Sequence, residues 1–189
     1  MDWSQHLRPR LEGRIVTLEP IEQQHVEGLR AAAVDERAWT WMSTRDTEAW
    51  IQWALTESDA YHFVVVKDGV VLGSTSYLNV VPEHLRLEIG NTWNTPSAWG
   101  TGANTEAKYL LLRHAFEVLR AHRVEFKTDA KNDRARAALA AIPADFEGIH
   151  RKHMLVRDGE RRDSAWYAVI DDDWPDVKGA LERRLRAKG

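Results

Sequence analysis

The sequence predicts one α/β domain of the α+β kind, with a mixed, mostly antiparallel sheet of about seven strands flanked by helices. The clearest observation is Asp68-Gly69, a strong hairpin turn signal between two β-rich runs. A strand–helix–strand segment follows over residues 85–128, and a second hairpin turns at residues 157–160. Hairpins on both sides of one such segment favour a mixed sheet over a repeating βαβ wheel. The predicted strands are residues 14–18, 62–67, 70–78, 85–91, 124–128, 146–156 and 164–170.

Capping residues and prolines mark the predicted helices. Asp46 suits the N-cap of a helix because its side chain accepts from an early N–H group. Pro143 ends an alanine-rich helix, and Pro175 suits the first position of a terminal one. The predicted helices are residues 21–34, 47–58, 105–121 and 132–141, with the terminal helix opening at residues 173–175. The long central helix has an apolar stripe of Ala107, Leu111, Ala115, Val118 and Leu119.

The composition is that of a globular protein, with 43% hydrophobic and 29% charged residues. The length of 189 residues suits a single domain over residues 1–189, with a short flexible tail at residues 1–10. A net charge of −3 is too balanced to predict a nucleic-acid or anionic-membrane partner. The N-terminus has no signal-peptide pattern, and no apolar run reaches the ~20 residues of a membrane span. We therefore expect a cytoplasmic enzyme or binding protein.

Metal chemistry finds little support in the sequence. The chain has no cysteine, which excludes disulfides, thiol chemistry and cysteine-based zinc sites. His150 and His153 are three residues apart on a predicted strand, so we expect them on opposite faces. We predict no metal cofactor.

A glycine motif, Trp99 to Ala107, precedes the long predicted helix. Gly100 and Gly102 let the backbone approach a ligand closely. The helix start adds N–H groups without intrahelical partners and the positive end of the macrodipole. Together these features predict a pyrophosphate cradle, while the same pattern also describes a tight turn with a satisfied helix cap.

The context of the motif excludes two common phosphate-binding classes. A nucleoside-triphosphate loop needs Gly-Lys-Ser/Thr and a dinucleotide fold needs a third glycine, and neither is present. The sequence instead resembles the GNAT superfamily of acetyltransferases, in the branch that contains the ribosomal-protein N-terminal acetyltransferases. The resembling stretches are residues 11–20, 88–93, 99–107, 115–117, 123–124, 132, 147–151 and 162–164.

The resemblance implies acetyl-CoA as cosubstrate and assigns residues to it. In the family the pyrophosphate lies on the loop and helix start, and the pantetheine arm pairs like an extra strand with the preceding strand. An asparagine lies beside that arm. The implied residues are Ile89, Gly90, Asn91, Thr92 and Trp93 for the arm, Trp99, Gly100, Thr101, Gly102, Ala103 and Asn104 for the pyrophosphate, and Asn132 beside the arm.

The catalytic residues of the resembling branch are not matched. Its ribosomal-protein members use a serine as general acid and a glutamate as general base, where this sequence has Ala135 and Met154. Glu88 is the base candidate that remains, because its strand leads directly to the cofactor. It is equally interpretable as a solvated strand residue, or as one in a salt bridge with Arg86 or another neighbour.

Aromatic side chains leave further alternatives open. Trp39 and Trp41 fall where the family covers its acceptor pocket, so they either form a substrate wall or pack in the core. Tyr77 and Tyr167 either donate a proton to the leaving thiolate or are core hydroxyls.

The leading functional interpretation is an N-acetyltransferase that acts by direct attack of an amine in a ternary complex. The acceptor is a protein or peptide N-terminus or a small-molecule amine. With weak base candidates, an α-amine of pKa ~7.7–8.0 is favoured over a lysine of ~10.4. An acyl-CoA-binding regulatory or sensor module with decayed catalysis is the alternative, and a non-catalytic interaction domain is a third. The resemblance also implies a homodimer.

Overall fold

The computed structural model describes residues 2–157 and 159–188, in which eight strands form one sheet. Their order is β1-β2-β3-β4-β5-β6-β8-β7, and only β5 and β6 are parallel neighbours. The strands are β1 Leu11–Glu12, β2 Thr17–Pro20, β3 Tyr61–Lys67, β4 Val70–Val81, β5 Arg86–Asn94, β6 Arg123–Asp129, β7 Asp145–Val156 and β8 Glu160–Ile170. The predicted mixed, mostly antiparallel sheet is confirmed. The eighth strand is β1, whose two residues are too few to give a periodic signal.

Five α-helices accompany the sheet in the described part of the chain: α1 Val26–Ala32, α2 Thr47–Thr56, α3 Ala103–Glu117, α4 Asp133–Ala140 and α5 Trp174–Arg186. Asp46 caps α2 as predicted, accepting from the Ala49 N–H at 2.9 Å. The helix predicted from residue 21 starts as a 3₁₀ turn over Gln23–His25 and becomes α-helical at Val26. Within these described residues, no helix is both long enough and apolar enough to cross a membrane.

The long helix α3 starts two residues before and ends four residues before the predicted bounds. Its N-cap is Gly102, whose φ of +96° is left-handed and therefore favours glycine. Its end comes early because Arg120 takes a left-handed φ of +58°, which breaks the helical path. Val118 consequently leaves the predicted apolar stripe and is 42% exposed.

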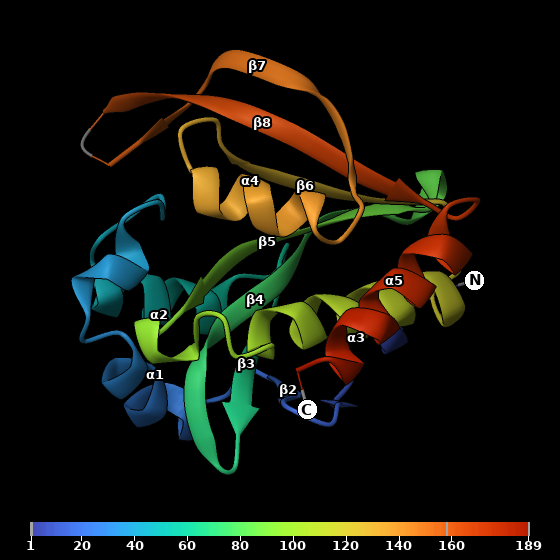
Figure 1. Cartoon of the computed structure of the whole chain (residues 1–189). Coiled ribbons are helices and arrows are strands. Elements are labelled where there is room, and N and C mark those ends of the chain that lie inside the picture. The colour runs from blue at the N-terminus through green and yellow to red at the C-terminus, as the bar shows by residue number, and fades with distance from the viewer. Residues whose placement is uncertain (1, 158, 189) are drawn as a thin grey trace.

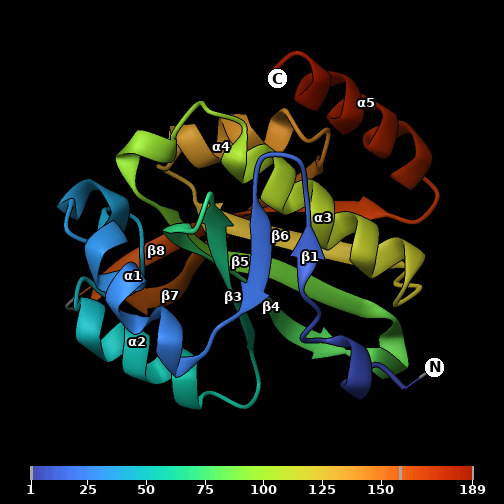
Figure 2. The same ribbon diagram turned by 90° about the horizontal axis from the view of Figure 1, so that it is seen from below.

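The helices lie against both faces of the sheet (Figure 1 and Figure 2). α3 and α5 lie side by side on one face, whereas α1 and α2 cover the other. A hydrophobic core lies on each face of the sheet. Side chains alternate along β3, so Phe63 and Val65 are buried toward α3 whereas Val64 is buried toward α1. Around β3 the sheet is therefore a central layer that is apolar on both faces.

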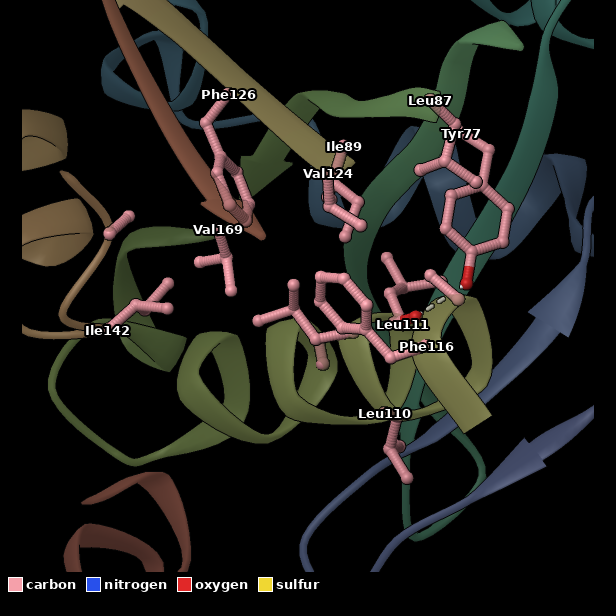
Figure 3. Close-up of a cluster of buried hydrophobic side chains, with 14 of the residues drawn as sticks. Tyr77, Leu87, Ile89, Leu110, Leu111, Phe116, Val124, Phe126, Ile142 and Val169 are labelled. Atoms are coloured by element: carbon pink, nitrogen blue, oxygen red, sulfur yellow. Dashed lines mark hydrogen bonds between the residues drawn. The ribbon is translucent and has the colours of Figure 1, made fainter. Parts of the chain in front are cut away.

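Tyr77 is part of the core beneath α3, and Figure 3 shows its hydroxyl directed at that helix. The hydroxyl donates to the Leu111 carbonyl oxygen at 2.7 Å, and burial raises the pKa of Tyr77. The buried Tyr167 hydroxyl accepts from Arg136 Nε at 3.1 Å. Both tyrosines are therefore core hydroxyls rather than proton donors to a thiolate.

Residues 2–10, the described part of the expected flexible tail, contain two side chains that are packed in the core. Trp3 and Leu7 are only 1% and 2% exposed and belong to the core on the α3 side. A 3₁₀ turn over Ser4–His6 connects them. The expectation was wrong because a short polar-looking segment gives no periodic signal, whereas two large apolar side chains are enough to dock it.

Candidate active site

Strands β5 and β6 separate after three residue pairs. Parallel pairing joins Arg86–Glu88 to Arg123–Glu125 and then stops, although both strands continue. A β-bulge bends β5 as it separates: Asn91 has a φ of +48°, and the register with β4 shifts. The β6-facing backbone of residues 89–94 is consequently left without a partner strand in the described chain.

The gap between these strands opens into a cleft of about 630 Å³. All five residues predicted for the pantetheine arm contribute to its lining. Asn132 also lines it; its Oδ1 caps α4 by accepting from the Ala135 N–H at 3.0 Å. The structure therefore brings together two segments that are 40 residues apart in sequence.

The start of α3 forms one end of the cleft. The N–H groups of Asn104 and Thr105 have no acceptor within the described residues, and the Asn104 Oδ1 is buried without a partner. Gly100, Gly102, Asn104 and Thr105 line the cleft, but Thr101 and Ala103 do not. The Thr101 hydroxyl instead donates to the Ala98 carbonyl oxygen at 2.7 Å and Ala103 is fully buried, so these two residues support the loop.

Three cations surround this end of the cleft, and sequence reasoning missed them. The Arg134 guanidinium lies 3.5 Å from the centroid of the Trp99 ring, and Lys188 Nζ donates to the Gly100 carbonyl oxygen at 2.8 Å. Arg184, on the same helix face as Lys188, also lines the cleft. In the described structure none of the three forms an ion pair. They come from α4 and the end of α5, so no local pattern could have grouped them.

Glu88 lies near the point where the strands separate, and it is 1% exposed. Its Oε2 accepts from Asn79 Nδ2 at 2.6 Å and from Lys127 Nζ at 3.0 Å. A Cβ at Gly90 would lie 2.8 Å from Glu88 Oε1, so glycine leaves room for that oxygen beside the strand. The predicted partner Arg86 pairs with Glu125 instead.

Lys108 is a second feature that the sequence did not reveal. Its ammonium is buried on the floor of the cleft and donates to Thr92 Oγ1 at 2.6 Å and Thr75 Oγ1 at 3.2 Å. Burial lowers the pKa of Lys108 to about 7, against an opposing effect of the Glu88 charge. The Thr92 hydroxyl in turn donates to the Gly90 carbonyl oxygen at 3.2 Å, so Lys108 braces the β5 bulge.

The two tryptophans predicted for the acceptor pocket have different places. Trp41 lines the cleft together with Trp53. Trp39 is 3% exposed, stacks on Trp93 at 4.8 Å between ring centroids and does not line the cleft. Its Nε1 donates to the Ala33 carbonyl oxygen at 3.1 Å, so Trp39 takes the core-packing role.

His150 and His153 lie on the same side of β7, contrary to our expectation. Their ring centroids are 5.6 Å apart, and both contact Trp166. The reason is a β-bulge between His150 and Met154, where Lys152 takes a φ of +51°. No group of three or more potential metal-ligating acidic or histidine side chains occurs among the residues that the structure describes.

The comparisons agree with this geometry. Residues 16–142 match the acetyltransferase (GNAT) domain family. The chain belongs to the GNAT acetyltransferase family. It is therefore an acyltransferase, of a family that uses acetyl-CoA.

Solved structures share the fold of this GNAT acetyltransferase. A GCN5-related N-acetyltransferase from Brucella melitensis is 34% identical with a TM-score of 0.88, covering 94% of this chain and 86% of that one. An acetyltransferase from T. thermophilus is 41% identical with a TM-score of 0.85, covering 93% and 96%. Mycobacterium smegmatis RimJ in complex with CoA-disulfide, 22% identical, shares the fold with a TM-score of 0.77 over 94% and 91% of the chains. The comparison with curated proteins gave no match.

The buried amine of this GNAT acetyltransferase predicts a measurable pH effect. Between pH ~7 and ~10 an unfolded lysine binds a proton that folded Lys108 does not, so the free energy of unfolding rises with pH in this window. Lys108→Met should remove this slope and stabilise the protein by roughly 1–3 kcal/mol below pH 7. Urea unfolding between pH 6 and pH 10 measures both effects. The exposed Lys131→Met is the control, and equal pH slopes for Lys108→Met and wild type would contradict the assignment.

Proposed function

We propose that this GNAT acetyltransferase moves an acetyl group from acetyl-CoA to a primary amine, which attacks directly in a ternary complex. The observation that carries the proposal is one cleft that joins an unpaired strand edge, an open helix start and a buried carboxylate. These are the groups that an extended amide-containing arm, a pyrophosphate and an amine proton require.

The residues at the cofactor end fit acetyl-CoA. The free N–H groups of Asn104 and Thr105 can donate to phosphate oxygens, and Arg134, Arg184 and Lys188 add positive charge. The unpaired backbone of residues 89–94 can hydrogen-bond the amides of the pantetheine arm. When bound, acetyl-CoA supplies the thioester that is cleaved and the thiolate that leaves.

Glu88 is the group proposed to take the amine proton. Its Oε2 is held by Asn79 and Lys127, which orients the carboxylate, while its Oε1 has no hydrogen bond in the described structure. Positioning of the amine supplies most of the rate enhancement in such a site, and a base adds less. The replacement of the branch's acid and base by Ala135 and Met154, which both line the cleft, is compatible with turnover on this basis.

An α-amine is the proposed acceptor, because it loses its proton near neutral pH without strong assistance. The test compares peptides that have a free N-terminus and no lysine with N-terminally blocked peptides that contain one lysine. We expect release of CoA thiol with the first group. Acetylation of lysine with untouched N-termini would contradict this choice of acceptor.

Gly102→Ala tests the proposed phosphate end. The φ of +96° strains any side chain at the helix start, and a Cβ would also lie only 3.0 Å from Ile15 Cδ1. We expect acetyl-CoA affinity, measured by calorimetric titration, to fall at least about tenfold. Gly69→Ala is the matched control, because Gly69 has a φ of +78° in a distant hairpin turn and should lose stability but not affinity. Unchanged affinity in Gly102→Ala would refute the cradle.

A regulatory module that binds acyl-CoA without turnover is the second candidate, motivated by Ala135 and Met154. Tight acetyl-CoA binding without thiol release over a panel of peptides, polyamines and aminoglycosides would favour it. A cytoplasmic location and a homodimer stay predictions; gel filtration with light scattering tests the second.

A further inference from the structure

Arg162 is a buried cation in the cleft, and no carboxylate of the described residues forms an ion pair with it. It belongs to β8, is 9% exposed and lines the cleft beside Met154. Its Nε has no hydrogen-bond partner, and the described residues place no carboxylate oxygen within ion-pair distance of its guanidinium. Burying an arginine in this way is unfavourable unless a further group pairs with it.

The two nearest acidic side chains are already engaged. Asp129 accepts from Arg157 Nη2 at 3.3 Å, and Glu88 accepts from Lys127 Nζ at 3.0 Å. Burial lowers the pKa of Arg162, and the charges of Asp129 and Glu88 oppose this without reversing it. Among the described residues no anion pairs with Arg162, so its guanidinium is available to an anion of a ligand.

Strand alternation places Arg162 on the acceptor face of the sheet. Ala165 and Tyr167 of β8 pack in the core toward α3, so Arg162 projects from the opposite face. Glu88 lies on that same opposite face, because its neighbours Leu87 and Ile89 pack toward α3. The base candidate and the unpaired guanidinium therefore share one side of the cleft.

The cations proposed to bind the cofactor phosphates lie at another end of the cleft. Arg134, Arg184 and Lys188 gather around the start of α3, beside Trp99 and Gly100. That end of the cleft lies on the face that α3 covers. Arg162 is therefore free to bind an anion other than the phosphates of acetyl-CoA.

The loop that contains Met42 and Ser43 is hydrogen-bonded to the β7–β8 hairpin. Arg157 Nη1 donates to the Met42 carbonyl oxygen at 3.0 Å, and the Arg157 N–H donates to the Ser43 carbonyl oxygen at 3.0 Å. Trp41 of the same loop lies under the Arg157 guanidinium. This connection holds the apolar side chains of Trp41 and Met42 in the same cleft as Arg162.

We propose that Arg162 is an anion subsite for the acceptor, so that the preferred amine substrate carries a carboxylate. The guanidinium would bind this carboxylate through its terminal nitrogens while the amine faces Glu88. The carboxylate can belong to a free amino acid or to an acidic side chain after a peptide N-terminus. The inference rests on the proposed amine acetylation.

Matched acceptor pairs test the subsite and separate the two sources. One pair is glycine and glycinamide; the other is alanyl-glutamate amide and alanyl-glutamine amide. In the pair whose carboxylate occupies the subsite, we expect the wild-type protein to prefer the acceptor with the carboxylate by about 10–100-fold in kcat/KM. Arg162→Met should reduce this ratio, taken per unprotonated amine, to about one, and Arg162→Lys should keep part of it. The pair that shows the preference identifies the source of the carboxylate.

Arg161→Met is the matched control, because Arg161 is the exposed neighbour and does not line the cleft. It should keep the wild-type ratio, and thermal unfolding checks that all variants fold. Acetylation of both members at equal rates, or a preference that survives Arg162→Met, would overturn the subsite and leave the proposed function intact.

If no amine is acetylated, the proposed function is wrong, and the anion subsite is then tested by ligand binding. Calorimetric titration of the CoA-loaded protein with N-acetylglycine and N-acetylglycinamide then replaces turnover. Binding of the carboxylate that is lost in Arg162→Met supports the subsite, whereas equal binding of both compounds overturns it.

Discussion

Glu88→Gln should lower kcat/KM for an amine acceptor by about 10²–10⁴-fold at neutral pH, the range in which a general base contributes. The substitution keeps the size of the side chain and its ability to accept from Asn79, but it removes the group that takes the proton. Because Glu88 lies outside the cradle at the start of α3, affinity for acetyl-CoA should change little. Steady-state kinetics and acetyl-CoA titration together measure this separation.

Glu125→Gln is the matched control for Glu88. Glu125 is the register partner of Glu88 on β6 and is also buried, but it pairs with Arg86 and Arg123 and does not line the cleft. If Glu88 had only a structural role, Glu88→Gln and Glu125→Gln should lower kcat/KM by similar factors. A loss of less than about threefold in Glu88→Gln would show that Glu88 is not the base.

The second large effect is on stability: Glu106→Ala should lower the free energy of unfolding by about 3–5 kcal/mol. Glu106 is 4% exposed and accepts three backbone hydrogen bonds, from Arg14 N at 3.0 Å, Ile15 N at 2.5 Å and Val16 N at 2.7 Å. Alanine would leave these donors without their charged acceptor. The turn between β1 and β2 would then lose its attachment to α3.

Thermal unfolding should show this as a decrease in Tm of about 10 °C for a chain of this size. Glu117→Ala on the same helix is the control, because its partially exposed pair with Lys178 is expected to contribute about 1 kcal/mol or less. Similar Tm values for Glu106→Ala and Glu117→Ala would contradict the structural role of Glu106.

The glycine motif shows how far local sequence reasoning reaches. A loop that needs glycine and a helix start with N–H groups that lack intrahelical partners are local properties, and the motif predicted both, although the helix begins two residues earlier than expected. The motif did not show that its own Glu106 attaches to a turn about 90 residues away. Nor did it show which of its residues face the cleft, since that depends on the helices packed around it.

Errors occurred where a bulge or a distant contact changed the direction of a side chain. The two histidines on β7 point the same way because of a bulge that period-2 reasoning does not include. Trp39 and Trp41 look alike in sequence, yet one stacks on Trp93 and the other lines the cleft. These outcomes depend on the neighbours that each side chain meets.

The sequence by itself therefore determined the order of elements and the mixed sheet, which follow from spacing, turn residues and helix ends that act over a few residues. The family was predicted from the resemblance of several motifs, and the phosphate cradle stays a prediction. Only the tertiary structure decided that Lys108 is buried under the β5 bulge and that Arg162 finds no ion-pair partner among the described residues. Burial and ion pairing depend on side chains that lie far apart in sequence, and the packing of the sheet and helices alone brings them together.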